Sequence, residues 1–225
     1  QHALKEYVGV DEEINNDVGS LQVDATEFLT DALYRRIELS VSNLFTTTSW
    51  SLMVSLTATN TWSANTTVSD PIATVDTGTS MIIANSGVVP NYGFISRGGL
   101  VNAKNHISVL DRVKYTSSDV GVGALAALFG LPELHVSTAM YNAGQEGDVS
   151  GTTQTNFFAD KCFIGYKPAS PGLRQVAAAY TFMSGLPRVR TWKDEERNAT
   201  AVEVEVKFVP KIIASLTGFL INNVE

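Results

Sequence analysis

The chain has 225 residues, enough for one large hydrophobic core or two smaller subdomains. Hydrophobic residues make up 44% of it, charged residues 17%, and the net charge at pH 7 is −7. This acidic balance argues against a dedicated nucleic-acid binder, whose surface would carry a basic stripe. The single cysteine, Cys162, excludes an intrachain disulfide, and its apolar neighbours predict a buried, inert thiol.

The first segment with a strong periodic pattern starts at Asp24. Residues 1–23 ahead of it are polar and mixed, so we expect extended chain or loop there. Asp24 is suited to be a helix N-cap, and Glu27 completes the Asp form of a capping box. An apolar stripe then predicts one long amphipathic helix that ends at Phe45. The stripe consists of Leu29, Leu33, Ile37, Val41 and Leu44.

A second helix is predicted after a polar stretch. Residues 46–69 are rich in Thr, Ser and Asn, and we expect mostly loop with some β-structure there. Asp70 is suited to the N-cap of the following helix, Pro71 to its first turn, and Gly87 to its C-terminal stop.

This second helix contains the sharpest catalytic motif of the sequence. Residues 76–80 read Asp-Thr-Gly-Thr-Ser, as in the loop of pepsin-like aspartic proteases, where the Asp is half of a dyad that shares a proton. That chemistry needs two carboxylates, and the sequence holds one copy of the motif, so a protease would have to be a homodimer. The alternative is that Asp76 is a solvated helix residue, in a helix that Gly78 weakens by about 1 kcal/mol.

The middle of the chain alternates strands and helices. We expect a strand over Tyr92–Ser96, a helix from Arg97 onward, and another over Gly123–Phe129 that stops at Gly130. A strand over His135–Met140 follows. The apolar face of the helix after Arg97 is formed by Leu100, Ala103, His106, Leu110 and Val113.

His106 lies on that apolar face, which predicts a core histidine whose hydrogen bonds are satisfied. No histidine has a cysteine or carboxylate at metal-ligand spacing. The sequence also lacks a Gly-x-Ser-x-Gly elbow and a phosphate-binding glycine-rich loop. We therefore predict no catalytic, cofactor-binding or metal-binding residues, no cofactor, and no enzymatic function.

The C-terminal part is predicted to be β-structure. Residues 144–156 are small and polar, which predicts a loop tip, and the charged residues 193–198 predict a turn. A strand is expected over Val202–Phe208, ending at Pro210, with another strand within residues 212–221.

Strict alternation of apolar and charged residues defines the first of these strands. Val204 is expected on its buried face, and Glu203 and Glu205 on its polar face.

Taken in order, these segments resemble the major capsid proteins of tailed phages, which share the Hong Kong 97 phage fold. In that family a long spine helix precedes a strand that begins Pro-Asn, a helix that ends Asp-Arg-Ile-Lys-Tyr, and a strand that ends Tyr-Asn. The matching segments here are Asp24 to Phe45, Ser69 to Pro71, Pro90-Asn91, Asn105 to Tyr115, Leu125 to Gly130, Tyr141-Asn142, Phe163 to Pro168, Pro171 to Leu173 and Ala179 to Phe182.

The resemblance implies an α+β fold with a long spine helix and with peripheral and apical subdomains. Residues 1–69 would supply an extended segment, the spine helix and a loop of the peripheral subdomain. Residues 70–170 would form the apical subdomain, and residues 171–225 would return as strands to the peripheral one. The family also carries an N-terminal arm and a hairpin ahead of the spine helix, so we expect further residues before Gln1.

The resemblance also implies a structural function. Many copies would assemble as hexamers and pentamers into an icosahedral shell that encloses viral double-stranded DNA without sequence-specific binding. Portal, scaffold or decoration proteins would be further partners, with no membrane involved, and assembly in the host cytoplasm would give a component of the virion. The alternatives are an encapsulin-like nanocompartment shell and, in another class, a homodimeric aspartic protease that uses Asp76.

Overall fold

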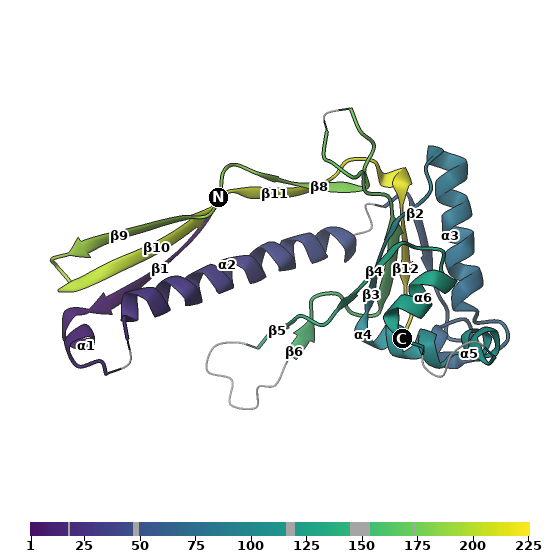
Figure 1. The fold of residues 1–225 in the computed structure, drawn as a ribbon, viewed down its shortest axis with the longest axis horizontal. Coiled ribbons are helices and arrows are strands. Elements are labelled where there is room, and N and C mark those ends of the chain that lie inside the picture. The colour runs from purple at the N-terminus through teal and green to yellow at the C-terminus, as the bar shows by residue number, and fades with distance from the viewer. Residues whose placement is uncertain (18, 47–49, 116–119, 145–153, 173) are drawn as a thin grey trace. The chain divides into compact units, whose positions relative to one another are not determined.

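The computed structural model describes all residues except 18, 47–49, 116–119, 145–153 and 173 (Figure 1). The chain folds into two compact units. Unit 1 consists of Gln1–Val41 and Thr181–Lys211, and unit 2 of Ser42–Tyr180 and Ile212–Glu225. Both units are thus built from segments distant in sequence. That they correspond to the peripheral and apical subdomains stays a prediction.

Unit 1 is built on a three-stranded antiparallel sheet. Its strand order is β1 (His2–Gly9), β10 (Ala199–Val206), β9 (Arg188–Asp194). Extended chain was expected before Asp24, and β1 provides it, but the short helix α1 (Val10–Ile14) was not predicted. The residues of β1 show no clear alternation of apolar and polar side chains, and at this sheet edge most of them are only partly covered.

The predicted long helix is confirmed as α2 (Leu21–Thr46), 26 residues and about 39 Å long. The prediction of Asp24 as its N-cap is wrong. The helix begins at Leu21, because the backbone N–H of Asp24 already donates to the carbonyl of Ser20 (3.2 Å). Leu29 and Leu33 of the stripe are buried in unit 1, together with Ala25.

Helix α2 packs in unit 1 against one face of the sheet. Val202, Val204 and Val206 of β10 are at most 2% exposed and share a hydrophobic cluster with Leu29 and Leu33, which confirms the buried face of the strand.

The prediction that Glu205 lies on an exposed face is wrong. Its side chain is buried, with Arg190 Nη2 at 3.6 Å from one carboxylate oxygen and Lys207 Nζ at 3.3 Å from the other. As the central strand, β10 has neighbours on both sides, and their long side chains cover a residue that alternation alone assigns to solvent.

Pro210 does not end the strand as predicted. The break falls at Lys207, and Pro210 lies inside β11 (Phe208–Ile212). Strand β11 pairs only with β8 (Ala179–Met183) in a two-stranded sheet. A proline, which lacks an N–H, is tolerated in such an edge position.

Unit 2 is built on a five-stranded mixed sheet with two buried faces. Its strand order is β2 (Leu52–Ser55), β12 (Gly218–Asn222), β7 (Lys161–Gly165), β3 (Tyr92–Ser96), β4 (Glu133–Ser137). Strand β3 has the predicted bounds. The strand predicted over His135–Met140 is divided between β4 and β5 (Met140–Asn142), and of residues 212–221 only the last part forms β12, after a turn of 3₁₀ helix, η2 (Ser215–Thr217).

The loop predicted for residues 144–156 falls mainly outside the described residues, but its end forms β6 (Gln154–Asn156), which pairs with β5. The stretch predicted as loop with some β-structure contains β2 and the 3₁₀ turn η1 (Trp62–Ala64), as expected.

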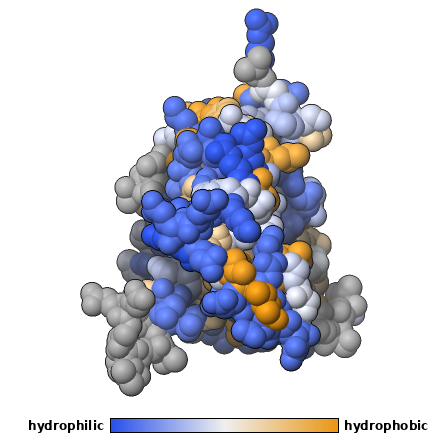
Figure 2. Space-filling view, turned by 90° about the vertical axis from the view of Figure 1, so that its left-hand side faces the viewer, coloured by the Kyte–Doolittle hydropathy of each residue, from blue (hydrophilic) through white to orange (hydrophobic). Residues whose placement is uncertain are grey.

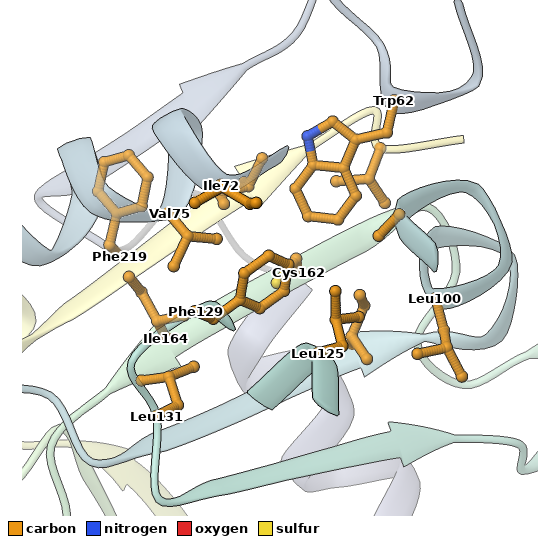
Figure 3. Close-up of a cluster of buried hydrophobic side chains, with 14 of the residues drawn as sticks. Trp62, Ile72, Val75, Leu100, Leu125, Phe129, Leu131, Cys162, Ile164 and Phe219 are labelled. Carbon is orange, nitrogen blue, oxygen red and sulfur yellow. The ribbon is translucent and has the colours of Figure 1, made fainter. Parts of the chain in front are cut away.

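Alternate residues of the central strands enter two different cores. Cys162 and Ile164 of β7 pack on the helical side of the sheet, whereas Phe163 between them packs on the other side with Trp50 and Phe158. Figure 3 shows the helical side, where Val75 lies beside Ile164. The two-residue period of a strand thus fills both faces from one short segment.

Within the described residues, unit 2 contains the helices α3 (Pro71–Ser86), α4 (Arg97–Asn105), α5 (Ile107–Val113) and α6 (Val122–Leu128), beside the last turn of α2. The caps of α3 are those predicted: the N–H of Ile72 donates to Asp70 Oδ1 (2.9 Å), and Gly87 has φ 71°.

The continuous helix predicted from Arg97 to Val113 is wrong. His106 has ψ 139° and separates α4 from α5, so the register changes. As a result Val109 is buried, whereas Leu110, expected on the apolar face, is 47% exposed.

Candidate assembly surfaces

Asp76, the candidate catalytic residue, lies in the middle of helix α3 and is exposed. An aspartic protease would need this residue in a tight turn, facing a second carboxylate. Gly78 of the motif has a packing role instead: a Cβ there would lie 2.5 Å from Cδ1 of Phe219 on strand β12. The glycine lets α3 approach the sheet, so the resemblance to the protease motif is explained by core packing.

His106 is a satisfied core histidine, as predicted. It is 1% exposed, with Ser69 Oγ 3.0 Å from Nε2 and Ser108 Oγ 2.8 Å from Nδ1. Ser108 donates in turn to Asp70 Oδ1 (2.9 Å). Burial lowers the pKa of His106, with nearby Asp70 opposing the shift. This hydrogen-bonded chain joins the N-termini of α3 and α5, with Ser69 and His106 buried and Asp70 and Ser108 half-buried.

Cys162 is fully buried, and burial raises the pKa of its thiol to about 12. It is therefore the inert core residue that the sequence predicted. Among the described residues, no group of three His, Cys, Asp or Glu side chains could hold a metal ion. No helix in the described part of the chain is both long and apolar enough to cross a membrane.

What the molecule does present is apolar surface, and much of it lies on unit 1. On α2, Val23, Phe28 and Tyr34 are each more than half exposed, away from the stripe that packs on the sheet. Figure 2 likewise shows patches of hydrophobic residues among hydrophilic ones on the surface. We treat these exposed apolar side chains as candidate contacts with another molecule.

The turn between β8 and β9 carries further exposed apolar side chains. Leu186 is 88% exposed, next to Gly185 in the left-handed region (φ 84°), and Met183 is 47% exposed. On strand β11, Val209 is 60% exposed. Such side chains at an exposed turn contribute little to the stability of unit 1 itself.

Both outer strands of the unit 1 sheet are open edges. Within the described residues, β1 and β9 each pair with β10 alone, and every residue of β9 except Asp194 is exposed. Exposed edges are ready to pair with another chain, and proteins protect them with charged side chains. Arg188, Arg190 and Lys193 give β9 this kind of protection.

An apolar groove of about 340 Å³ lies in unit 2, between the edge strand β2 and helix α3. Its walls include Met53, Val68 and Met81, all at least 39% exposed, and its floor includes Phe219.

Comparison with solved structures shows what this arrangement resembles. A phage-related protein from Bordetella bronchiseptica RB50 matches with a TM-score of 0.79 and 22% identity, over 99% of this chain and 75% of that one. A virus-like particle from Pyrococcus furiosus matches with a TM-score of 0.63 and 13% identity, over 98% and 75%. The capsid structure of the cyanophage P-SCSP1u matches with a TM-score of 0.62 and 11% identity, over 98% and 71%. The chain has the tailed-phage capsid fold.

This capsid fold is the predicted α+β class with its long helix, now confirmed across almost the whole chain. No family model and no curated protein matches the sequence. The sequence patterns did not reveal the exposed apolar surface of unit 1. Periodicity marks the residues that face the core, whereas Phe28 and Leu186 are apolar residues outside any such pattern.

Proposed function

We propose that this chain is a major capsid protein, a subunit that assembles with many copies of itself into an icosahedral shell. The observation that carries the proposal is the likeness to the cyanophage P-SCSP1u capsid over 98% of the chain at a TM-score of 0.62, beside the likeness to a phage-related protein at 0.79. The exposed apolar surface and the open sheet edges of unit 1 support it, because a shell subunit is completed by its neighbours.

In this proposal, unit 1 is the peripheral subdomain and unit 2 the apical one. Copies form hexamers and pentamers that enclose double-stranded DNA as the head of a virion, assembled in the host cytoplasm. A net charge of −7 suits a shell that must not bind the enclosed DNA tightly. Portal, scaffold and decoration proteins would take part in assembly, and the role of the chain is structural.

The test is to express the full-length protein with its assembly partners and to examine the product by electron microscopy and light scattering. We expect uniform polyhedral particles of megadalton mass. A clean monomer or dimer under all such conditions would contradict the proposal.

Nuclease protection then identifies the contents of the particles. Protected double-stranded DNA supports a viral capsid. Particles that hold protein cargo and no DNA would point to the nanocompartment shell instead.

A further inference from the structure

The sheet of unit 1 carries negative charge at one of its ends. Helix α1 directly follows β1, and the N–H of Val10 donates to the carbonyl of Asn198 (3.2 Å), so α1 lies beside the turn between β9 and β10 (Figure 1). The exposed carboxylates here, which we call the acidic end, are Asp11, Glu12, Glu13, Glu195 and Glu196. Two cations also lie near this end: Lys193 on β9 and Arg197 in the turn, where Arg197 is held over the Tyr7 ring (4.3 Å).

The other end of the same sheet is positive. The register places Arg188 opposite Glu205, at the far end of β9 from its turn with β10. We call the exposed Arg188, Arg190 and Lys207 the basic end. Glu205 is buried between Arg190 and Lys207, so its charge is held inside the sheet by these two cations.

Each end also exposes an apolar side chain. Ile14, the last residue of α1, is 74% exposed at the acidic end. Leu186 is 88% exposed at the basic end, in a turn fixed by the hydrogen bond from Ser184 N–H to the Lys207 carbonyl (3.0 Å). Apolar side chains among charges that are mostly of one sign are suited to a protein surface of opposite sign.

We propose that the acidic end of one copy binds the basic end of the next copy, head to tail. The two ends are different surfaces, so the contact is heterologous, and a heterologous contact forms a ring where its rotation closes. This inference rests on the proposed function, since hexamers and pentamers are such rings.

DNA is the competing occupant of the basic end. A second copy fits better, because Leu186 and Met183 flank the cations with apolar surface that a phosphate backbone would leave uncovered. The carboxylate of Glu205 between two of the cations also weakens the field that would attract DNA.

Charge reversal tests the contact in the full-length protein expressed with its partners. The acidic-end variant is Glu195→Lys with Glu196→Lys, and the basic-end variant is Arg188→Glu. At low salt, each should lower the yield of particles on the order of tenfold, because like charges would then meet. The chain with all three substitutions should recover much of that yield. Arg36→Glu, an equal reversal on an exposed residue of α2, is the matched control and should assemble like the parent.

Circular dichroism of unassembled subunits checks that each variant folds. If Arg188→Glu does not fold, because Glu205 lies opposite, Arg188→Gln replaces it with a smaller expected loss. Folded single-end variants that assemble like the parent, or a triple variant that recovers nothing, would overturn the inference while the parent still forms shells. Normal particles that lose only their DNA in the basic-end variant would assign that end to DNA. Failure of the parent to assemble would instead count against the proposed function.

Discussion

Unit 1 and unit 2 differ in how much apolar surface each can bury by itself. Unit 2 packs buried side chains on both faces of a five-stranded sheet, with helices α3 to α6 on one side. Unit 1 has a single cluster between α2 and one face of a three-stranded sheet, whose other face is lined by Lys5, Arg190 and Trp192. Units of this size rarely gain more than about 3–5 kcal/mol from one core.

The difference indicates that one part of the chain can be stable by itself while another part serves assembly. Unit 2 has cores on both faces of its sheet, whereas unit 1 has a single cluster and exposes the large apolar side chains of Phe28 and Leu186. We therefore expect substitutions in the two cores to differ in their effects on folding and stability.

The largest effect is expected for Val204→Asp in unit 1. Val204 is fully buried against the cluster that includes Leu29 and Leu33, and a carboxylate there would be unpaired, which costs several kcal/mol. Since this approaches the whole stability of so small a core, unit 1 should lose its structure while unit 2 keeps its own. Hydrogen exchange measured by mass spectrometry on the soluble subunit would show protection lost in β10 and kept in β7.

The control for this prediction is Glu203→Gln, a half-buried neighbour whose side chain points to the other face of the sheet. It should be nearly silent. Equal tolerance of both substitutions would mean that the face of β10 packed against α2 does not hold unit 1 together.

Gly78→Ala in unit 2 should have the next largest effect. In an ordinary helix this change stabilises by about 1 kcal/mol, but here the new Cβ would lie 2.5 Å from Phe219. Overpacking should instead destabilise the protein by about 1–3 kcal/mol, measured by denaturant unfolding. Adding Phe219→Leu should relieve part of the clash, and Ser80→Ala, on the exposed side of α3, should be harmless. A rise in stability with Gly78→Ala alone would refute the packing role.

Acidification should have a smaller effect on stability, through the buried histidine His106 and its hydrogen bonds. Because burial lowers its pKa, the folded state binds fewer protons than the unfolded state once the pH falls below the ordinary histidine value of about 6.5. The stability should therefore decrease from that pH down to the folded-state pKa, and not change further below it. His106→Gln should flatten this part of the stability profile, in a comparison that cancels the contributions of His2 and His135. Parallel profiles for the parent and the variant would contradict the assignment.

The smallest effect is expected for Asp76→Asn. Asp76 is exposed on α3, so its neutralisation should leave folding and assembly unchanged within about 0.5 kcal/mol. Peptide cleavage at acid pH that disappears in this variant would show that the residue is catalytic after all.

The sequence predicted most of unit 2, because its elements carry local signals. Asp70, Pro71 and Gly87 delimit α3 by capping chemistry, and Gly130 with φ 66° ends α6. The break at His106 was not predictable, since Leu110 satisfies helical spacing as well as Val109 does. At the break the histidine bonds Ser108 locally and Ser69 from a distant segment, and the second of these bonds comes from the tertiary structure.

Unit 1 was predicted less well, for a different physical reason. Strand β1 pairs with a partner far away in the sequence, His2 opposite Val206, and its own residues show no clear alternation. The burial of Glu205 depends on Arg190 of a neighbouring strand. The assembly surfaces had no signal at all, because apolar residues outside a periodic pattern cannot be assigned to a partner from one sequence.

Hydrogen exchange, measured in assembled particles and in free subunits, tests whether unit 1 depends on neighbouring copies for its stability. If unit 1 is completed by its neighbours, amides of β9 and α1 should exchange rapidly in the free subunit and become protected in the particle, while β7 and β12 of unit 2 are protected in both. The same strong protection of β9 and α1 in free subunits, with no change on assembly, would contradict the claim that unit 1 depends on other copies.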